Sequence, residues 1–148
     1  MKTIETLHRS GVAVSPDTTI RSAAELMEQA GVGSLAVVEG ERLVGIVTDR
    51  DIVRRAVARD LPSDARIDFV MTADPVTVDV GADIHSVYGL LRTHAVRRIP
   101  VVRGAHFVGM ISTDDLLIEL AADLADLARP LTAEVLFSHR EASLPSLA

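Results

Sequence analysis

Apolar and polar positions follow one another in an order that occurs twice along the 148 residues of this chain. In the first half, a short apolar run at 12–14 is typical of a strand, and apolar residues at helical spacing over 20–30 predict an amphipathic helix. Two β-branched runs at 35–38 and 43–47 flank a glycine-containing turn and predict a hairpin. A second helix is predicted from about Asp49, so the unit is β-α-β-β-α.

The second half repeats these elements. The pattern predicts a strand over 76–78, a helix over 83–94, a hairpin with strands at 99–102 and 107–111, and a helix from about Thr113. Both halves therefore encode the same β-α-β-β-α unit, which places the chain in the α+β (α/β) class.

The two halves also share sequence. The string GIVTDRDIV, which begins at Gly45, returns as GMISTDDLL, which begins at Gly109, an offset of 64 residues. The same offset relates further apolar pairs without a gap: Leu7 and Met71, Val12 and Val76, Val14 and Val78, Ile20 and Ile84, Leu26 and Leu90. This is a tandem repeat, and a unit of about sixty residues buries too little apolar surface to be secure alone. We therefore expect two units packed face to face, with a ligand cleft between them.

The expected boundaries of the two units follow from the turn-forming residues of the sequence. The first unit spans 5–61, the connector spans 62–66, and the second unit spans 67–128. After Pro130 the residues lose helical periodicity, so the tail 129–148 is expected to be only partly ordered.

Composition narrows the class of protein. A hydrophobic content of 48% with 24% charged residues suits one compact, soluble domain. The net charge of −6 and the 3% aromatic content argue against a nucleic-acid partner, because such binding relies on basic patches and base stacking. There is no cysteine, no apolar stretch typical of a secretion signal, and no run long enough to span a membrane. We expect a cytoplasmic protein that does not interact with membranes.

Each copy of the repeated string places a hydroxyl three residues before a carboxylate, as Thr48 with Asp51 and as Ser112 with Asp115. At the start of a helix this spacing is a capping box, in which the two side chains satisfy backbone N–H groups. The same groups also suit a nucleotide, because a carboxylate accepts hydrogen bonds from a ribose diol and a helix N-terminus favours phosphate. Spacing alone favours capping, and both roles can hold together.

With these strings, the segments VMT at 70–72, PVTV at 75–78 and VRRIPVV at 96–102 resemble the cystathionine-beta-synthase (CBS) domain. The pair resembles the Bateman module of two such domains, over roughly residues 5 to 125. The resemblance implies a pseudo-two-fold CBS pair that binds an adenosine-containing ligand, with Asp at the ribose and Thr or Ser at the sugar and phosphate. Such modules commonly form dimers through their helices.

The two copies differ at the junction between the first predicted helix and the hairpin. The second has Arg97 and Arg98 where the first has Gly33 and Ser34. In family members that bind adenine nucleotides, basic residues here reach the phosphates, a task that suits the donor fork of arginine. The alternative is that the arginines form only a solvated basic helix end. The resemblance implies a nucleotide site formed by Arg97, Arg98, Pro100, Val101, Ser112, Asp115, Thr48, Asp51, Ala36, Val37 and Thr77, in which Arg97 and Arg98 act with Ser112 and Asp115.

No catalytic or metal constellation is evident. The five histidines lack the close spacing of a metal site, and no nucleophile motif accompanies Ser112. We therefore expect a non-enzymatic regulatory or energy-sensing module without a required cofactor, with AMP, ADP, ATP or S-adenosylmethionine as its regulatory ligand. The alternative is a ligand-free structural or interaction protein that docks an unknown protein target.

The last predicted helix suggests a homodimer. Over 116–128, Glu119, Asp123 and Asp126 form one narrow polar stripe, and apolar residues cover the remaining surface. One core cannot bury so broad an apolar surface, so part of it is expected at a subunit interface. The alternative is that residues 131–137 fold back over this helix within one chain.

Overall fold

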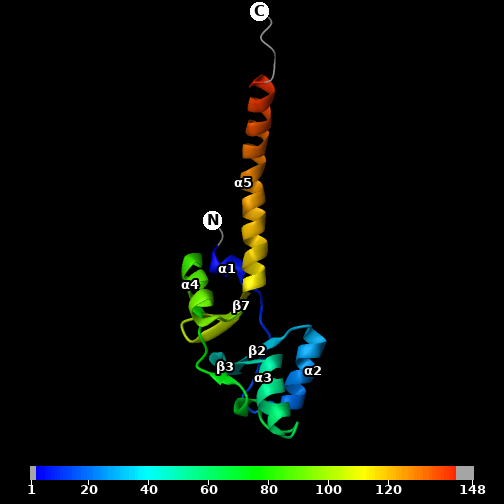
Figure 1. Cartoon of the computed structure of the whole chain (residues 1–148). Helices are drawn as coiled ribbons and strands as arrows, with labels where there is room; N and C mark the ends of the chain where they lie inside the picture. Colours follow the sequence, from blue (N-terminus) through cyan, green and yellow to red (C-terminus); the bar gives the residue numbers. More distant parts are fainter. Residues whose placement is uncertain (1–2, 143–148) are drawn as a thin grey trace, which may run out of the picture. The chain divides into compact units, whose positions relative to one another are not determined.

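The computed structural model describes residues 3–142, with side chains described for 3–130 (Figure 1). The chain separates into two compact units, residues 1–113 and residues 114–148, and each is considered by itself. Within the described residues, the first unit contains one seven-stranded sheet with helices, which confirms the expected mixed class.

The sheet of the described residues follows the order β1-β2-β3-β7-β6-β5, and β4 pairs with β3. The strands are β1 (Ala13–Val14), β2 (Ser34–Glu39), β3 (Arg42–Thr48), β4 (Thr72–Ala73), β5 (Val78–Asp79), β6 (Arg98–Arg103) and β7 (His106–Ser112). The α-helices are α1 (Ile4–Leu7), α2 (Ile20–Ala30), α3 (Asp49–Asp51), α4 (Ile84–His94) and α5 (Thr113–Ala142). Shorter helical turns are η1 (Ile52–Ala56), η2 (Val57–Arg59) and η3 (Ile67–Phe69).

The two hairpins are built alike. Ser34 lies opposite Thr48 in β2–β3, and Arg98 lies opposite Ser112 in β6–β7, so both ladders have the same register at the offset of 64. Gly40 and Gly104 stand in the turns with φ of 62° and 65°, a conformation that glycine adopts without strain. The hairpins join through the pair Arg42 and His106, which makes the two halves one sheet.

The two longer predicted helices form where expected because their ends are capped. α2 begins after Thr19, whose side chain accepts a hydrogen bond from the Ser22 N–H, and it ends at Gly31 in the left-handed region. α4 begins after Asp83, whose side chain accepts from the His85 N–H. α2 carries Ile20, Ala23 and Met27 into the core of the first repeat, which its apolar spacing predicted.

The leading segment of each repeat packs on the other repeat. Ile67 and Val70, which follow the connector, belong to the core cluster of the first repeat. Arg9, near the N-terminus, exchanges two backbone hydrogen bonds of 2.9 Å with Met110 of the second repeat. Each repeat is therefore completed by chain from the other.

Two helical segments differ from their predictions. The helix that begins at Asp49 changes into a π-helix at η1 and a 3-10 turn at η2, where a regular helix was expected. α5 continues through Pro130 to Ala142, although the loss of helical periodicity after Pro130 predicted a tail that is only partly ordered. The residues after Pro130 include leucine, alanine and glutamate, which favour helix. The continuous helix contradicts a fold-back of 131–137 over the preceding part of the same helix, and residues 143–148 lie outside the described part.

Candidate functional site

A cavity of about 400 Å³ opens in the first unit where three segments meet. The first is the β3–α3 junction, the second follows β4, and the third is the junction between α4 and β6. Its volume lies in the range of about 300–1,000 Å³ that is typical of small-molecule sites. Its walls are Ile46, Thr48, Asp49, Arg50, Asp51, Thr72, Pro75, Val76, Ala95, Val96, Arg97, Arg98 and Pro100.

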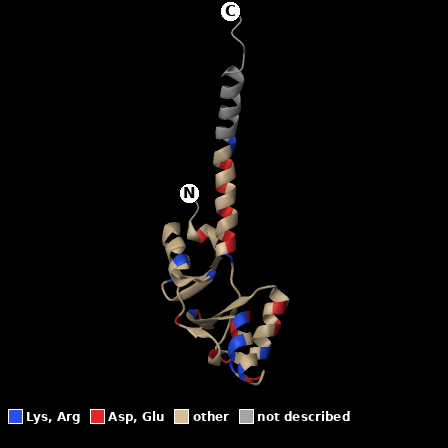
Figure 2. Ribbon diagram, viewed as in Figure 1, with Lys and Arg blue, Asp and Glu red and all other residues tan. Residues whose placement is uncertain are grey.

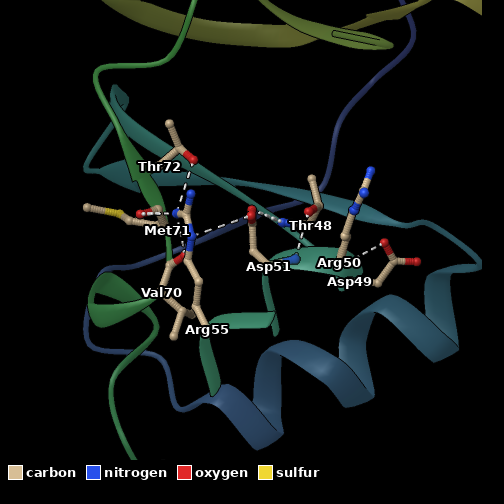
Figure 3. Close-up of polar contacts among 8 residues, drawn as sticks. All are labelled: Thr48, Asp49, Arg50, Asp51, Arg55, Val70, Met71 and Thr72. Atoms are coloured by element: carbon tan, nitrogen blue, oxygen red, sulfur yellow. Dashed lines mark hydrogen bonds and ion pairs between the residues drawn. The ribbon is translucent and has the colours of Figure 1, made fainter. Parts of the chain in front are cut away.

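The Thr48–Asp51 pair on one wall forms the capping box that its spacing predicted (Figure 3). The Asp51 N–H donates to Thr48 Oγ1 at 3.1 Å, and the Thr48 N–H donates to Asp51 Oδ2 at 2.9 Å. A carboxylate has two oxygens with about four acceptor positions, so the cap uses only part of its capacity. Asp51 can therefore cap the helix and still accept a hydrogen bond from a ligand.

Arg55 holds this wall against the segment that enters the second repeat. Its Nη1 donates to the backbone carbonyls of Val70 and Met71 at 3.1 and 3.3 Å and to Thr72 Oγ1 at 3.3 Å (Figure 3). Its Nε lies 3.9 Å from Asp51 Oδ1. Arg55 thus fixes two cavity residues, Asp51 and Thr72, relative to each other.

Asp49 and Arg50 also line the cavity, next to the capping box. The Arg50 N–H donates to Asp49 Oδ1 at 2.8 Å, which turns the Asp49 carboxylate back over the helix start. A Cβ atom at Gly33 would lie 3.2 Å from Asp49 Oδ2, so glycine leaves room for that carboxylate. Asp49 was not among the predicted site residues because its role in the repeated string suggested only a helix start.

Arg97 and Arg98 form the opposite side of the cavity. They follow Ala95, which ends α4 in the left-handed region with φ of 51°, and both are exposed. The Arg97 carbonyl accepts a hydrogen bond of 2.8 Å from the Thr113 N–H, which anchors the junction to the end of β7. With Arg50, three guanidinium groups face two carboxylates around the cavity, so arginine outnumbers aspartate in its lining.

The cavity contains part of the predicted site. Arg97 and Arg98 share the cavity with Thr48 and Asp51 of the first repeat, and Ser112 and Asp115 are not among its lining residues. β4 pairs with β3 of the first repeat, and the chain that follows it, at Pro75 and Val76, also lines this cavity. Ser112 lies opposite Arg98 in the β6–β7 ladder, and Asp115 belongs to the second unit.

Of the remaining predicted site residues, one lines the cavity and the others do not. Pro100 lines the cavity, and it is buried at the start of β6. Ala36, Val37 and Val101 are fully buried, and Thr77 is half-buried; none of these four is among the residues that line this cavity. The apolar walls come instead from Ile46, Val76 and Val96, which sequence reasoning did not select. Val76 was marked only as a strand residue in the repeat.

The described residues form neither a metal site nor a membrane-spanning helix. No group of three or more His, Cys, Asp or Glu side chains within that part of the chain could hold a metal ion. No helix there has the length and apolar character needed to cross a membrane.

Comparison with known proteins gives consistent matches. The family model for the CBS domain matches twice, over residues 4–58 and 65–122. The uncharacterized protein YlbB of Bacillus subtilis is 41% identical over 99 residues, which is 66% of this chain and 67% of that protein. Hypoxic response protein 1 of Mycobacterium tuberculosis is 30% identical over 119 residues, which is 78% of this chain and 83% of that protein.

Among solved structures, a CBS domain protein of Pyrobaculum aerophilum in complex with AMP superimposes with a TM-score of 0.72. It is 31% identical, and the match covers 82% of this chain and 99% of that protein. The likeness thus extends over nearly all of a protein whose bound molecule is a nucleotide.

Proposed function

The chain belongs to the CBS domain family, and from that premise we propose that it is a non-enzymatic regulatory module that binds an adenine nucleotide. The proposed site is the cavity between the β3–α3 junction and the α4–β6 junction. AMP, ADP and ATP are the candidate ligands, and no resident cofactor is required. The module is proposed to act in the cytoplasm and to pass the occupancy of its site to a protein target.

One observation carries the proposal: a single cavity combines Asp51, at a helix start, with the pair Arg97 and Arg98. A nucleotide needs acceptors for its ribose hydroxyls and donors for its phosphate. Carboxylates provide only acceptors and guanidinium groups provide only donors, so the two ends of the cavity match the two ends of a ribose phosphate.

The other walls suit the base. Ile46, Val76 and Pro100 give the cavity an apolar side, and apolar walls with a few polar groups are the usual composition of a nucleotide-sized site. In this arrangement the base lies against these residues, the ribose lies at Asp51 and Thr48, and the phosphate lies at Arg97 and Arg98. The complex of the Pyrobaculum aerophilum relative with AMP supports this class of ligand.

A homodimer is the second part of the proposal. On α5, large apolar side chains are exposed to solvent in the single chain: Leu117, Ile118, Leu120, Leu124 and Leu127, with exposed fractions of 44–67%. Contiguous apolar surface of this kind marks interaction sites. The competing function, a ligand-free dimer that docks a partner protein, rests on the same helix.

A ligand panel tests the nucleotide proposal. At a concentration about 100 times its dissociation constant, AMP should stabilise the folded protein by ~2.7 kcal/mol, because the nucleotide binds only the folded state. The measurement is the melting temperature with adenosine, AMP, ADP, ATP and S-adenosylmethionine at millimolar concentrations. If none of them raises the melting temperature, the ligand-free alternative is favoured.

A further inference from the structure

Arg55 lies at an irregular point of the chain. It belongs to η1, a π-helix in which the Val57 N–H donates to the Ile52 carbonyl, five residues back. π-Helical turns are rare, are wider than α-helical turns and occur frequently at functional sites. The wider turn changes the direction of the side chains within it, and the Arg55 side chain reaches the backbone carbonyls of Val70 and Met71. The irregular turn therefore coincides with an arginine that binds a distant segment of the chain.

The second repeat differs at the equivalent position. At the offset of 64, Arg55 corresponds to Glu119, which lies within the α-helix α5. Figure 2 shows basic residues on the segment that begins with α3 and acidic residues along α5. Because the repeats share the motif and the hairpin register, the repeat itself does not require an arginine in a π-helix here. A role at the cavity explains the difference, since Asp51 lines that cavity and Asp115 is not among its lining residues.

The guanidinium group of Arg55 lies between two polar side chains of the cavity wall, Asp51 and Thr72 (Figure 3). Its Nε lies 3.9 Å from Asp51 Oδ1, and its Nη1 donates to Thr72 Oγ1 at 3.3 Å. The second carboxylate oxygen, Asp51 Oδ2, accepts from the Thr48 N–H at 2.9 Å. The Asp51 carboxylate is therefore held at both of its oxygens, which fixes its orientation.

The two groups that Arg55 holds have complementary hydrogen-bonding capacities. A carboxylate is an acceptor with about four lone-pair positions, so Asp51 can accept a further hydrogen bond from a ligand. Thr72 Oγ1 accepts from Arg55, which leaves the proton of its hydroxyl for donation. In a vicinal diol, one hydroxyl can donate while its neighbour accepts. Asp51 and Thr72 together thus match the 2′- and 3′-hydroxyls of a ribose.

We propose that Arg55 is a positioning residue that orients Asp51 and Thr72 toward the ribose diol, so that the site selects ribonucleotides over nucleotides without these hydroxyls. The inference rests on the nucleotide site proposed above, and it assigns Thr72 to that site as a ribose contact. Arg55 is not among the residues that line the cavity, so it acts through the two that do. Polar groups that are fixed before the ligand arrives bind it more tightly, because less freedom is lost on binding.

Two ligands that differ only in the ribose hydroxyls test the proposal. AMP carries both hydroxyls, and 2′,3′-dideoxy-AMP carries neither. The parent protein should bind AMP about tenfold or more tightly than the dideoxy form, because a hydrogen bond to a charged group contributes roughly that factor. Arg55→Gln should reduce this preference to about threefold or less, by weakening AMP while the affinity for dideoxy-AMP changes less than about twofold. Calorimetric titration of both ligands gives the two affinities.

Arg54→Gln is the matched control. It removes the same charge from a neighbouring exposed arginine that does not line the cavity, so the preference for AMP should stay at the parent value. Thr72→Val replaces the hydroxyl by a methyl group and should lower the preference, whereas Thr72→Ser should keep it. The Thr72 variants also decide the question if Arg55→Gln does not fold, which circular dichroism would show. An unchanged preference in Thr72→Val would overturn the inference.

The remaining outcomes separate this inference from the proposed function. Equal losses of AMP and dideoxy-AMP in Arg55→Gln would assign the arginine a purely structural role and overturn the inference, as would a variant that keeps the parent's preference. A parent that binds both ligands equally would also overturn it, while the proposed nucleotide site would stand. A parent that binds neither ligand would remove the proposed function, and the inference with it.

Discussion

Gly109→Ala is expected to lower the free energy of unfolding by about 2–3 kcal/mol, because the added methyl group has no room. A Cβ atom at Gly109 would lie only 2.4 Å from the backbone carbonyl oxygen of Arg9 and 2.4 Å from His8 Cδ2. The backbone of Arg9 cannot move away without breaking its two hydrogen bonds to Met110. Urea denaturation of the variant beside the parent measures the loss.

Gly89→Ala provides the matched control. Gly89 lies within α4, and a Cβ atom built there meets nothing within 4 Å. The same substitution should stabilise the protein by about 0.5–1 kcal/mol, because alanine loses less backbone freedom than glycine in a helix. If Gly109→Ala were as stable as the parent, the close passage of the N-terminal segment across β7 would be wrong.

Replacing both Arg97 and Arg98 by alanine should weaken AMP binding about a hundredfold or more while changing adenosine binding little. A charge-assisted hydrogen bond contributes roughly 1.5–3 kcal/mol, and about 1.4 kcal/mol corresponds to a factor of ten. Only AMP has the phosphate that these donors would hold. Calorimetric titration of both ligands against parent and variant separates the phosphate contribution from that of the nucleoside.

Arg92→Ala is the control for a loss of positive charge nearby. Arg92 is exposed on the last turn of α4 and does not line the cavity, so its removal should change AMP affinity by less than about threefold. Equal losses of AMP and adenosine in the double variant would assign the arginines a structural role instead. An unchanged AMP affinity would remove them from the site.

Local patterns predicted most of the fold. The strand bounds of the hairpins β2–β3 and β6–β7 were predicted to within one or two residues. β-Branched runs on both sides of a glycine turn fit few structures other than a hairpin. α2 was predicted over the observed residues because its apolar residues recur at helical spacing. The continuation of α5 through Pro130 was not expected because the residues after Pro130 lack helical periodicity.

The site was harder to predict because its halves lie far apart in sequence. The repeat suggested that Arg97 and Arg98 act with the motif of their own copy, at Ser112 and Asp115. In the structure Arg97 and Arg98 line a cavity together with Thr48 and Asp51 of the first copy. That grouping is a long-range contact that neither spacing nor periodicity contains. Because the two copies have similar lengths, nothing in the sequence indicated that Arg97 and Arg98 lie near the motif of the first copy.

A crystal structure of the protein grown with AMP tests the central claim most directly. The account predicts AMP in the cavity, with a phosphate oxygen within about 2.7–3.2 Å of a guanidinium nitrogen of Arg97 or Arg98, as hydrogen bonding requires. It also predicts a ribose hydroxyl that donates to the Asp51 carboxylate. AMP bound with its phosphate away from both arginines, or an empty cavity in crystals grown with saturating AMP, would contradict the account.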